Sequence, residues 1–106
     1  MRLKLSLIWM TLAFSLVAFG SSRSQRERGA AAFTTNGCPY CHTIHNQGGH
    51  KGPDLSGVGR ILTETQIRTQ IAHGGKGMPP FGDVLKPDEV NDLVAYLRSC
   101  REKPKK

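Results

Sequence analysis

Residues 38 to 42 read Cys38-Pro39-Tyr40-Cys41-His42, and the interpretation of the whole chain starts from this pentad. Two cysteines separated by two residues and followed directly by a histidine form the attachment signature of a c-type haem. One helical turn presents both thiols to the two vinyl groups of one porphyrin, and the next residue places an imidazole on the iron. We therefore predict that Cys38 and Cys41 hold one haem c through two thioether bonds, and that His42 is an axial ligand of its iron.

Three other kinds of site use similar residues. A thioredoxin-type redox motif expects a βαβ setting, and the sequence shows no strand pattern of period two. A zinc site needs four ligands, usually as two pairs, and a second cysteine pair is missing. A structural disulfide between Cys38 and Cys41 leaves His42 without a role. These observations weigh against all three kinds of site. A thiol oxidoreductase without haem is still kept as an alternative, and it predicts a colourless protein.

The sixth iron ligand decides whether the haem only carries electrons or also binds small molecules. Met78 is the only methionine after residue 20, and it lies in a loop rich in Gly and Pro that can approach a flat ring closely. Ligation by His and Met raises the reduction potential of the iron. We predict Met78 as the second axial ligand. His45, His50 and His73 are its competitors for a bis-histidine site.

The first twenty residues have the pattern of a secretory signal peptide. Arg2 and Lys4 precede an uncharged run at residues 5–19, and small residues stand at Ala18 and Gly20. The run is shorter than the about 20 residues that cross a bilayer comfortably. We predict cleavage near Gly20 and a periplasmic protein. An uncleaved anchor facing the periplasm is the alternative, and only in that form do we expect contact with the membrane.

The composition limits the remainder to one small domain. The 106 residues include 15 Lys or Arg and 8 Asp or Glu, a formal charge of +7 that falls to +5 when residues 1–20 are removed. The 86 residues that follow contain four aromatic residues, which make a thin core for a domain of this size. Small domains are often stabilised by a bound group. We expect such a group to complete the core.

Four helical segments are expected, joined by loops rich in Gly and Pro. A capping box at Thr63 and Gln66 and a stop at Gly74 delimit the third segment, and Pro87 begins the last. The first two segments are expected at residues 24–34 and, as a short turn, at 39–45. We divide the chain into a signal peptide at 1–20, one domain at 21–100 and a basic, mobile tail at 101–106.

Residues 24–100 resemble class I monohaem cytochromes c of the bacterial periplasmic type. Besides the pentad, the stretch GPDLSGVGR, which begins at Gly52, is similar to the family's G-P-x-L-x-G-x-x-G-R with one residue fewer between the last glycines. The resemblance implies an all-α cytochrome c fold, with about four short helices around one covalent haem. It also implies that the Pro53 carbonyl accepts the ring N–H of the axial histidine, that Leu55 packs on the haem and that Arg60 lies near a propionate.

Two further pairs resemble the helix-crossing residues of that family. They are Gly29 and Phe33 on the first helix and Leu93 and Tyr96 on the last. A glycine lets two helices cross closely, and the aromatic rings fill the corner beside it. Cys100, near the end of the last helix, is interpreted as a buried small hydrophobic residue or a free thiol, with dimerisation through it as the lesser option.

The family resemblance implies an electron-transfer protein and not an enzyme. Lys51, Lys76 and Lys86 lie in or beside the loops expected to border the haem, so we expect redox protein partners with acidic docking surfaces. Nucleic acid is disfavoured as a partner, because no aromatic platform is interleaved with the basic residues. Two alternatives stay open: a dedicated cytochrome subunit of a dehydrogenase or oxidase complex, and a haem ligand sensor or weak peroxidase from which Met78 dissociates.

Overall fold

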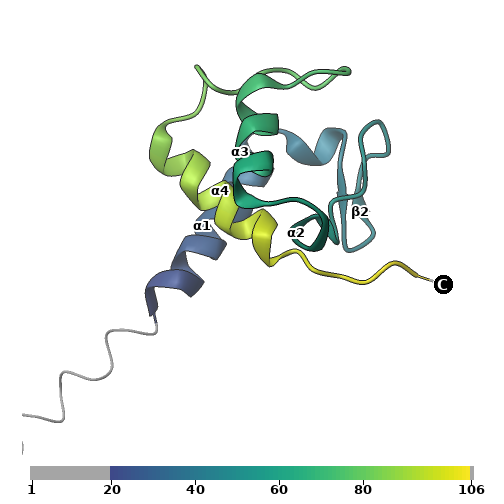
Figure 1. Ribbon diagram of the computed structural model, residues 1–106, viewed down its shortest axis with the longest axis horizontal. Helices are drawn as coiled ribbons and strands as arrows, with labels where there is room; N and C mark the ends of the chain where they lie inside the picture. The colour runs from purple at the N-terminus through teal and green to yellow at the C-terminus, as the bar shows by residue number, and fades with distance from the viewer. Residues whose placement is uncertain (1–19, 106) are drawn as a thin grey trace, which may run out of the picture.

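The computed structural model describes residues 20–105, in which helices pack against one another and irregular loops lie beside them (Figure 1). The predicted signal peptide at 1–20 lies outside the described residues except for Gly20. In chain order, the elements are helix α1 Gly20–Thr35, the 3₁₀ turn η1 Cys38–Tyr40, strands β1 Thr43–Ile44 and β2 Gln47–Gly48, and helices α2 Val58–Ile61, α3 Glu64–His73 and α4 Pro87–Ser99. The mainly helical fold agrees with the expectation from the sequence.

Helices α3 and α4 begin where the local signals predict. The capping box of α3 is confirmed, since Thr63 Oγ1 accepts from the Gln66 backbone N–H at 3.2 Å and Gln66 Oε1 accepts from the Thr63 N–H at 2.8 Å. Gly74 ends α3 with a φ of 64°, in the left-handed region that favours glycine. Pro87 occupies the first position of α4. The boundaries of these two helices are therefore set by residues at their own ends.

The middle of the chain departs from the expectation. The turn expected at residues 39–45 is a single 3₁₀ turn followed by a two-stranded hairpin, in which Thr43 pairs with Gly48 and Ile44 with Gln47. The sequence analysis did not anticipate this hairpin within the all-α fold. Each strand has two residues, too few to show an alternating pattern. A further helical turn, α2, lies between the second and third expected segments, where a connection rich in Gly and Pro was expected.

Helices α1 and α4 cross (Figure 1), and Gly29 of α1 lies at their contact. A Cβ on Gly29 would overlap the carbonyl oxygen of Asp92, so only glycine permits this approach. The rings of Phe33 and Tyr96 meet edge to face beside the crossing, with centroids 5.9 Å apart. Arg28 Nε donates to Asp92 Oδ2 at 3.2 Å on the outer side. The crossing fixes one wall of the interior.

The core is built from the inner faces of α3 and α4. Ile67 and Ile71 on α3 are buried against Leu93, Val94 and Leu97 on α4. These residues are spaced three and four apart, so each helix buries one stripe. The stripes face a set of half-buried loop residues that includes Cys38, Leu55, Met78 and Phe81.

The chain after α4 returns to the loop between β2 and α2. Cys100 is buried, and its thiol donates to the Tyr96 carbonyl at 3.4 Å. The Glu102 N–H donates to the Ser56 carbonyl at 2.9 Å, and Arg101 Nη1 donates to the Gly59 carbonyl at 2.6 Å. The described part of the predicted tail thus has hydrogen-bond partners on a neighbouring segment.

Candidate functional site

An apolar pocket lies between the helices and the loops. It is open to solvent on one side, and its non-atom space, open solvent at the mouth included, is about 570 Å³. Four of the predicted site residues line it: Cys38, His42, Leu55 and Met78. They come from three separate parts of the chain, and the fold brings them together against the apolar stripes of α3 and α4.

The two thiols of the pentad lie on one turn. Gly37, with a φ of 76°, lets the chain enter η1, and the His42 N–H donates to the Cys38 carbonyl at 3.0 Å. Cys38 and Cys41 are both half-buried free thiols. Burial raises the pKa of the Cys38 thiol, and the nearby Cys41 contributes a smaller effect in the same direction. At neutral pH Cys38 is therefore a protonated thiol beside an apolar pocket.

The ring of His42 is held in one orientation by the next loop. Its Nδ1 lies 2.7 Å from the carbonyl oxygen of Pro53. Because a carbonyl only accepts, Nδ1 carries the proton, and the lone pair of Nε2 is left for a metal. A Cβ on Gly52 would stand 2.8 Å from His42 Cε1, so the glycine allows the loop backbone to pack on the ring. The loop therefore fixes both the tautomer and the angle of the imidazole.

Met78 is presented by a tight turn after α3. The Gly75 N–H donates to the Met78 carbonyl at 2.8 Å, and the Met78 N–H donates back at 3.1 Å. Lys76 and Gly77 between them have φ angles of 53° and 90°, which close the turn. Gln70 Nε2 donates to Met78 Sδ at 3.7 Å. The thioether is thus held by both the turn and a side chain of α3.

Gln70 is a site residue that the sequence analysis missed. It lines the pocket together with Ile67 and Ile71 of the same helix. Gln70 follows Ile67 by three positions and directly precedes Ile71. The available signal was this shared helical face, which placed a polar residue beside the apolar stripe of α3. Its contact with Met78 is tertiary and could not be predicted from the local pattern.

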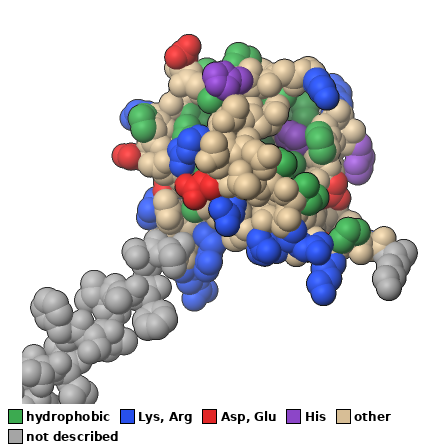
Figure 2. Space-filling model, in the orientation of Figure 1, with side chains coloured by type: hydrophobic (Ala, Val, Ile, Leu, Met, Phe, Trp, Pro, Cys, Tyr) green, Lys and Arg blue, Asp and Glu red, His purple; other side chains and the backbone are tan. Residues whose placement is uncertain are grey.

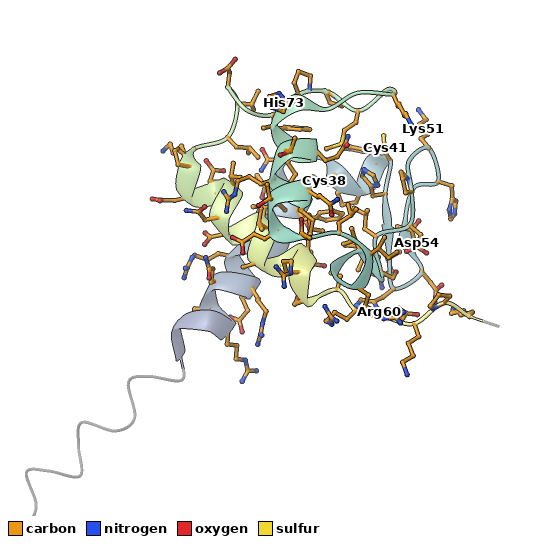
Figure 3. The ribbon with its side chains drawn as sticks, in the orientation of Figure 1. Cys38, Cys41, Lys51, Asp54, Arg60 and His73 are labelled. Atoms are coloured by element: carbon orange, nitrogen blue, oxygen red, sulfur yellow. The ribbon has the colours of Figure 1, made fainter. Side chains whose placement is uncertain are left out.

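The remaining predicted site residues, Cys41, Pro53 and Arg60, do not line the pocket. Pro53 acts through the His42 ring, and Cys41 is half-buried on the same turn as Cys38. Arg60 is exposed on α2 and does not line the pocket; Figure 3 shows it at the lower edge of the molecule, away from both cysteines. The competing histidines are all exposed and outside the pocket lining: His45, His50 and His73.

The residues of the pocket fit a haem c. The donor set comprises two free thiols, an imidazole with a free Nε2 and a thioether. Thiols attach the vinyl groups of a porphyrin, and imidazole with thioether is the ligand pair of low-spin cytochromes c. Apolar side chains such as Leu55, Ile71 and Leu93 form the walls. The close approach of Gly52 to the His42 ring leaves no side chain between the loop and this ligand.

Comparisons with known proteins place the chain in a family. Residues 24–97 match the family model described as cytochrome C oxidase, cbb3-type, subunit III. Cytochrome c6 of Nostoc is 31% identical over 99 residues, which cover 87% of this chain and 87% of that protein. The cbb3-type cytochrome c oxidase subunit FixP of Sinorhizobium medicae is 33% identical over 88 residues; the match covers 72% of this chain and 30% of FixP, so the chain spans less than a third of that relative.

The fold has a counterpart among solved structures. The c-type cytochrome SorU from Sinorhizobium meliloti superposes with a TM-score of 0.63 at 20% sequence identity, over 74% of this chain and 93% of SorU. Within residues 20–105, no helix has the length and apolar character that a membrane span requires. The match is to electron-carrier cytochromes, which are not enzymes, and their family implies a covalent haem c. The chain belongs to the family of monohaem cytochrome c domains represented by subunit III of cbb3-type oxidases, and it is an electron-carrier cytochrome.

Proposed function

We propose that the protein carries one electron at a time between redox proteins in the periplasm. In this proposal one haem c is attached to Cys38 and Cys41, with His42 and Met78 as axial ligands. The observation that supports it most directly is the 2.7 Å contact from His42 Nδ1 to the Pro53 carbonyl, since it leaves Nε2 available beside two free thiols. When bound, the haem supplies an iron that changes oxidation state by one electron.

The chain contributes ligands and a dry pocket. Pro53 holds the His42 ring so that it keeps one orientation in both oxidation states. The turn at Gly75 and the Gln70 amide hold the Met78 thioether. Apolar walls exclude water, which limits the rearrangement of dipoles when the charge of the site changes. The resemblance implies a contact between Arg60 and a propionate, but the side chain is exposed and lies outside the pocket lining, so this contact is no part of the proposed function.

The proposed partners are redox proteins with acidic docking surfaces. Lys51, Lys76 and Lys86 are exposed on the loops that flank the pocket, and Tyr40, between the two thiols, is 84% exposed. An exposed aromatic ring with lysines around it suits a small, short-lived interface with a charge-complementary protein. Removing the three lysines is therefore expected to slow electron transfer at low salt and to have little effect at high salt.

A second candidate function is a dedicated cytochrome subunit of a larger complex. The relative that favours it is FixP, which is named as a subunit of a cbb3-type cytochrome c oxidase. The two candidates differ in how the protein behaves in detergent extracts. A stoichiometric partner that copurifies would support the subunit, whereas a haem-containing monomer in the periplasmic fraction would support the free carrier.

The decisive experiment is to isolate the exported protein, record its reduced visible spectrum and a pyridine haemochrome, and measure its mass. We expect a chain that begins near Ser21 and carries the mass of one haem. A full-length chain that carries a haem would instead support the uncleaved, membrane-anchored form. A colourless protein with two titratable thiols at Cys38 and Cys41 would refute the proposal.

The axial methionine is tested by single substitutions. Met78→Ala is expected to change the ferric spectrum and to lower the reduction potential, because the thioether favours reduced iron. Matched controls are His45→Ala, His50→Ala and His73→Ala, which should leave both unchanged. If Met78→Ala resembles the wild type while one of the histidine variants changes, the ligand assignment is wrong.

A further inference from the structure

We propose that the protein has a second binding surface, which docks onto the anionic headgroups of a phospholipid bilayer. This surface, the basic corner, consists of exposed side chains on α2, at the end of α4 and in the tail: Arg60, Arg98, Arg101, Lys103 and Lys105. None of them lines the apolar pocket. The inference therefore adds a binding partner to the electron transfer proposed above.

Backbone contacts bring the basic corner together from distant parts of the sequence. The Gly59 N–H donates to the Cys100 carbonyl at 2.8 Å, and Arg101 Nη1 donates to the Gly59 carbonyl at 2.6 Å. A Cβ on Gly59 would overlap the Arg98 carbonyl, so α2 touches the end of α4 directly. Arg60 therefore lies beside the last turn of α4 and the start of the tail.

The basic corner occupies a different side of the molecule from the pentad. Figure 2 shows Lys and Arg side chains gathered along the lower edge, from the visible start of α1 to the C-terminal tail. In the same orientation Figure 3 places Arg60 at this edge, and Cys41 and Lys51 at the upper right. A bilayer at the lower edge would leave the cysteine turn facing the aqueous phase.

Within the residues that the structure describes, one member of the basic corner, Arg98, has a carboxylate within ion-pair distance. Glu102 Oε2 lies 2.8 Å from His45 Nδ1. Glu64 lies 3.3 Å from Arg68 and at the longer distance of 3.9 Å from Arg98. Lys105 Nζ donates to the neutral Asn46 Oδ1 at 3.1 Å. Among the side chains that the structure describes, Arg60, Arg101, Lys103 and Lys105 form no ion pair. The excess charge is free to attract phosphate groups.

The surroundings of the basic corner favour a lipid surface over an acidic protein. Ile61, directly after Arg60, is 76% exposed, and basic residues beside a protruding aliphatic side chain suit the boundary between headgroups and acyl chains. Strong protein interfaces instead centre on aromatic anchors, and the exposed aromatic Tyr40 belongs to the pentad.

The test uses the exported, haem-containing protein and two triple variants of equal net charge. One removes charge from the basic corner (Arg98→Gln, Lys103→Gln, Lys105→Gln), and the control removes it from the pocket loops (Lys51→Gln, Lys76→Gln, Lys86→Gln). Each is sedimented with vesicles of phosphatidylcholine alone and of equal parts phosphatidylglycerol and phosphatidylcholine. The readout is the ratio of the two partition coefficients, so that any contribution of residues 1–19 to both vesicles cancels.

For the wild type we expect a clear preference for the phosphatidylglycerol vesicles that weakens as salt is added. Each removed basic residue should reduce binding about fivefold, so the corner variant should lose about a hundredfold of this preference and the control much less. Ile61→Ser should weaken binding to the same vesicles without changing the slope with salt. An unchanged visible spectrum in each variant shows that the haem site is intact, which keeps this test separate from that of the proposed function.

Three results would overturn the proposal. One is a wild type with no preference for phosphatidylglycerol. Another is an equal loss in both triple variants, which would show a response to net charge alone. The third is retention of the wild type on immobilised polyglutamate, lost in the corner variant, without any binding to vesicles, which would assign the basic corner to an acidic protein.

Discussion

Replacing Gln70 by leucine would remove the amide that lies 3.7 Å from Met78 Sδ while keeping the size of the side chain. The positive end of the amide points at the sulfur and draws electron density from the atom proposed to bind the iron. This disfavours the oxidised state, which carries the larger positive charge. Gln70→Leu is therefore expected to lower the reduction potential.

The size of the shift follows from the geometry of this contact. A net hydrogen bond contributes about 0.5–1.5 kcal/mol, and sulfur is a weak acceptor. For one electron, 59 mV corresponds to about 1.4 kcal/mol, so the expected decrease is about 20–60 mV. The lower half of this range is favoured because Gln70 Nε2 also donates to the Gly74 carbonyl, at 3.2 Å.

The assay is a spectroelectrochemical titration of the haem-containing protein at several pH values. Thr69→Leu is the matched control, because Thr69 is exposed on the same helix and is no part of the pocket lining. It should shift the potential by less than Gln70→Leu does. A rise in potential, or a decrease no larger than in the control, would refute the role assigned to the amide. The spectrum of the oxidised protein should keep its Met-ligated character in both variants.

Three further predictions concern stability. Gly29→Ala should lower the free energy of unfolding by about 1–3 kcal/mol, because its Cβ meets the Asp92 carbonyl; thermal melts with Ala31→Ser as control measure it. Hydrogen bonds from Ser56 lower the pKa of Asp54, so its stabilising effect is present above the unfolded value of about pH 4 and is lost as the pH falls through the folded value. Urea melts of Asp54→Asn should therefore differ from the wild type at neutral pH and converge with it in acid. Finally, the protein without haem should be largely unfolded at room temperature, and a cooperative melt by circular dichroism would contradict this.

How far the sequence predicts the structure depends on the range of each interaction. The start of α3 is predictable because Thr63 and Gln66 satisfy each other's backbone within one turn. The α1–α4 crossing is predictable for a different reason. Gly29 and Phe33 share one helical face, and their resemblance to a known family supplied the partner helix. The first prediction needs only a short stretch of sequence, whereas the second also needs the family resemblance.

The hairpin and Gln70 show where this information ends. His45 and Asn46 adopt φ angles of 51° and 65°, although neither is glycine, and the pairing of Thr43 with Gly48 holds them there. No local sequence pattern predicts such a turn. Gln70 becomes a site residue only because the Met78 turn folds back over α3. The path of the tail likewise depends on partners more than forty positions away in sequence, such as Gly59 for Arg101.

These long-range contacts explain how a loop with little regular structure can hold the proposed iron ligand, His42, in one orientation. The Gly52 N–H donates to the Cys41 carbonyl at 2.7 Å, and the Leu55 N–H donates to the Thr43 carbonyl at 2.8 Å, so the segment with Pro53 is tied to both sides of His42. Each such bond contributes only about 0.5–1.5 kcal/mol, less than the cost of ordering the residues it joins. We therefore expect the loop to depend on the proposed haem for its order, as much as the haem would depend on the loop for its ligand. Ligand geometry and folding are then one property of this chain, and a change that loosens the loop should weaken both together.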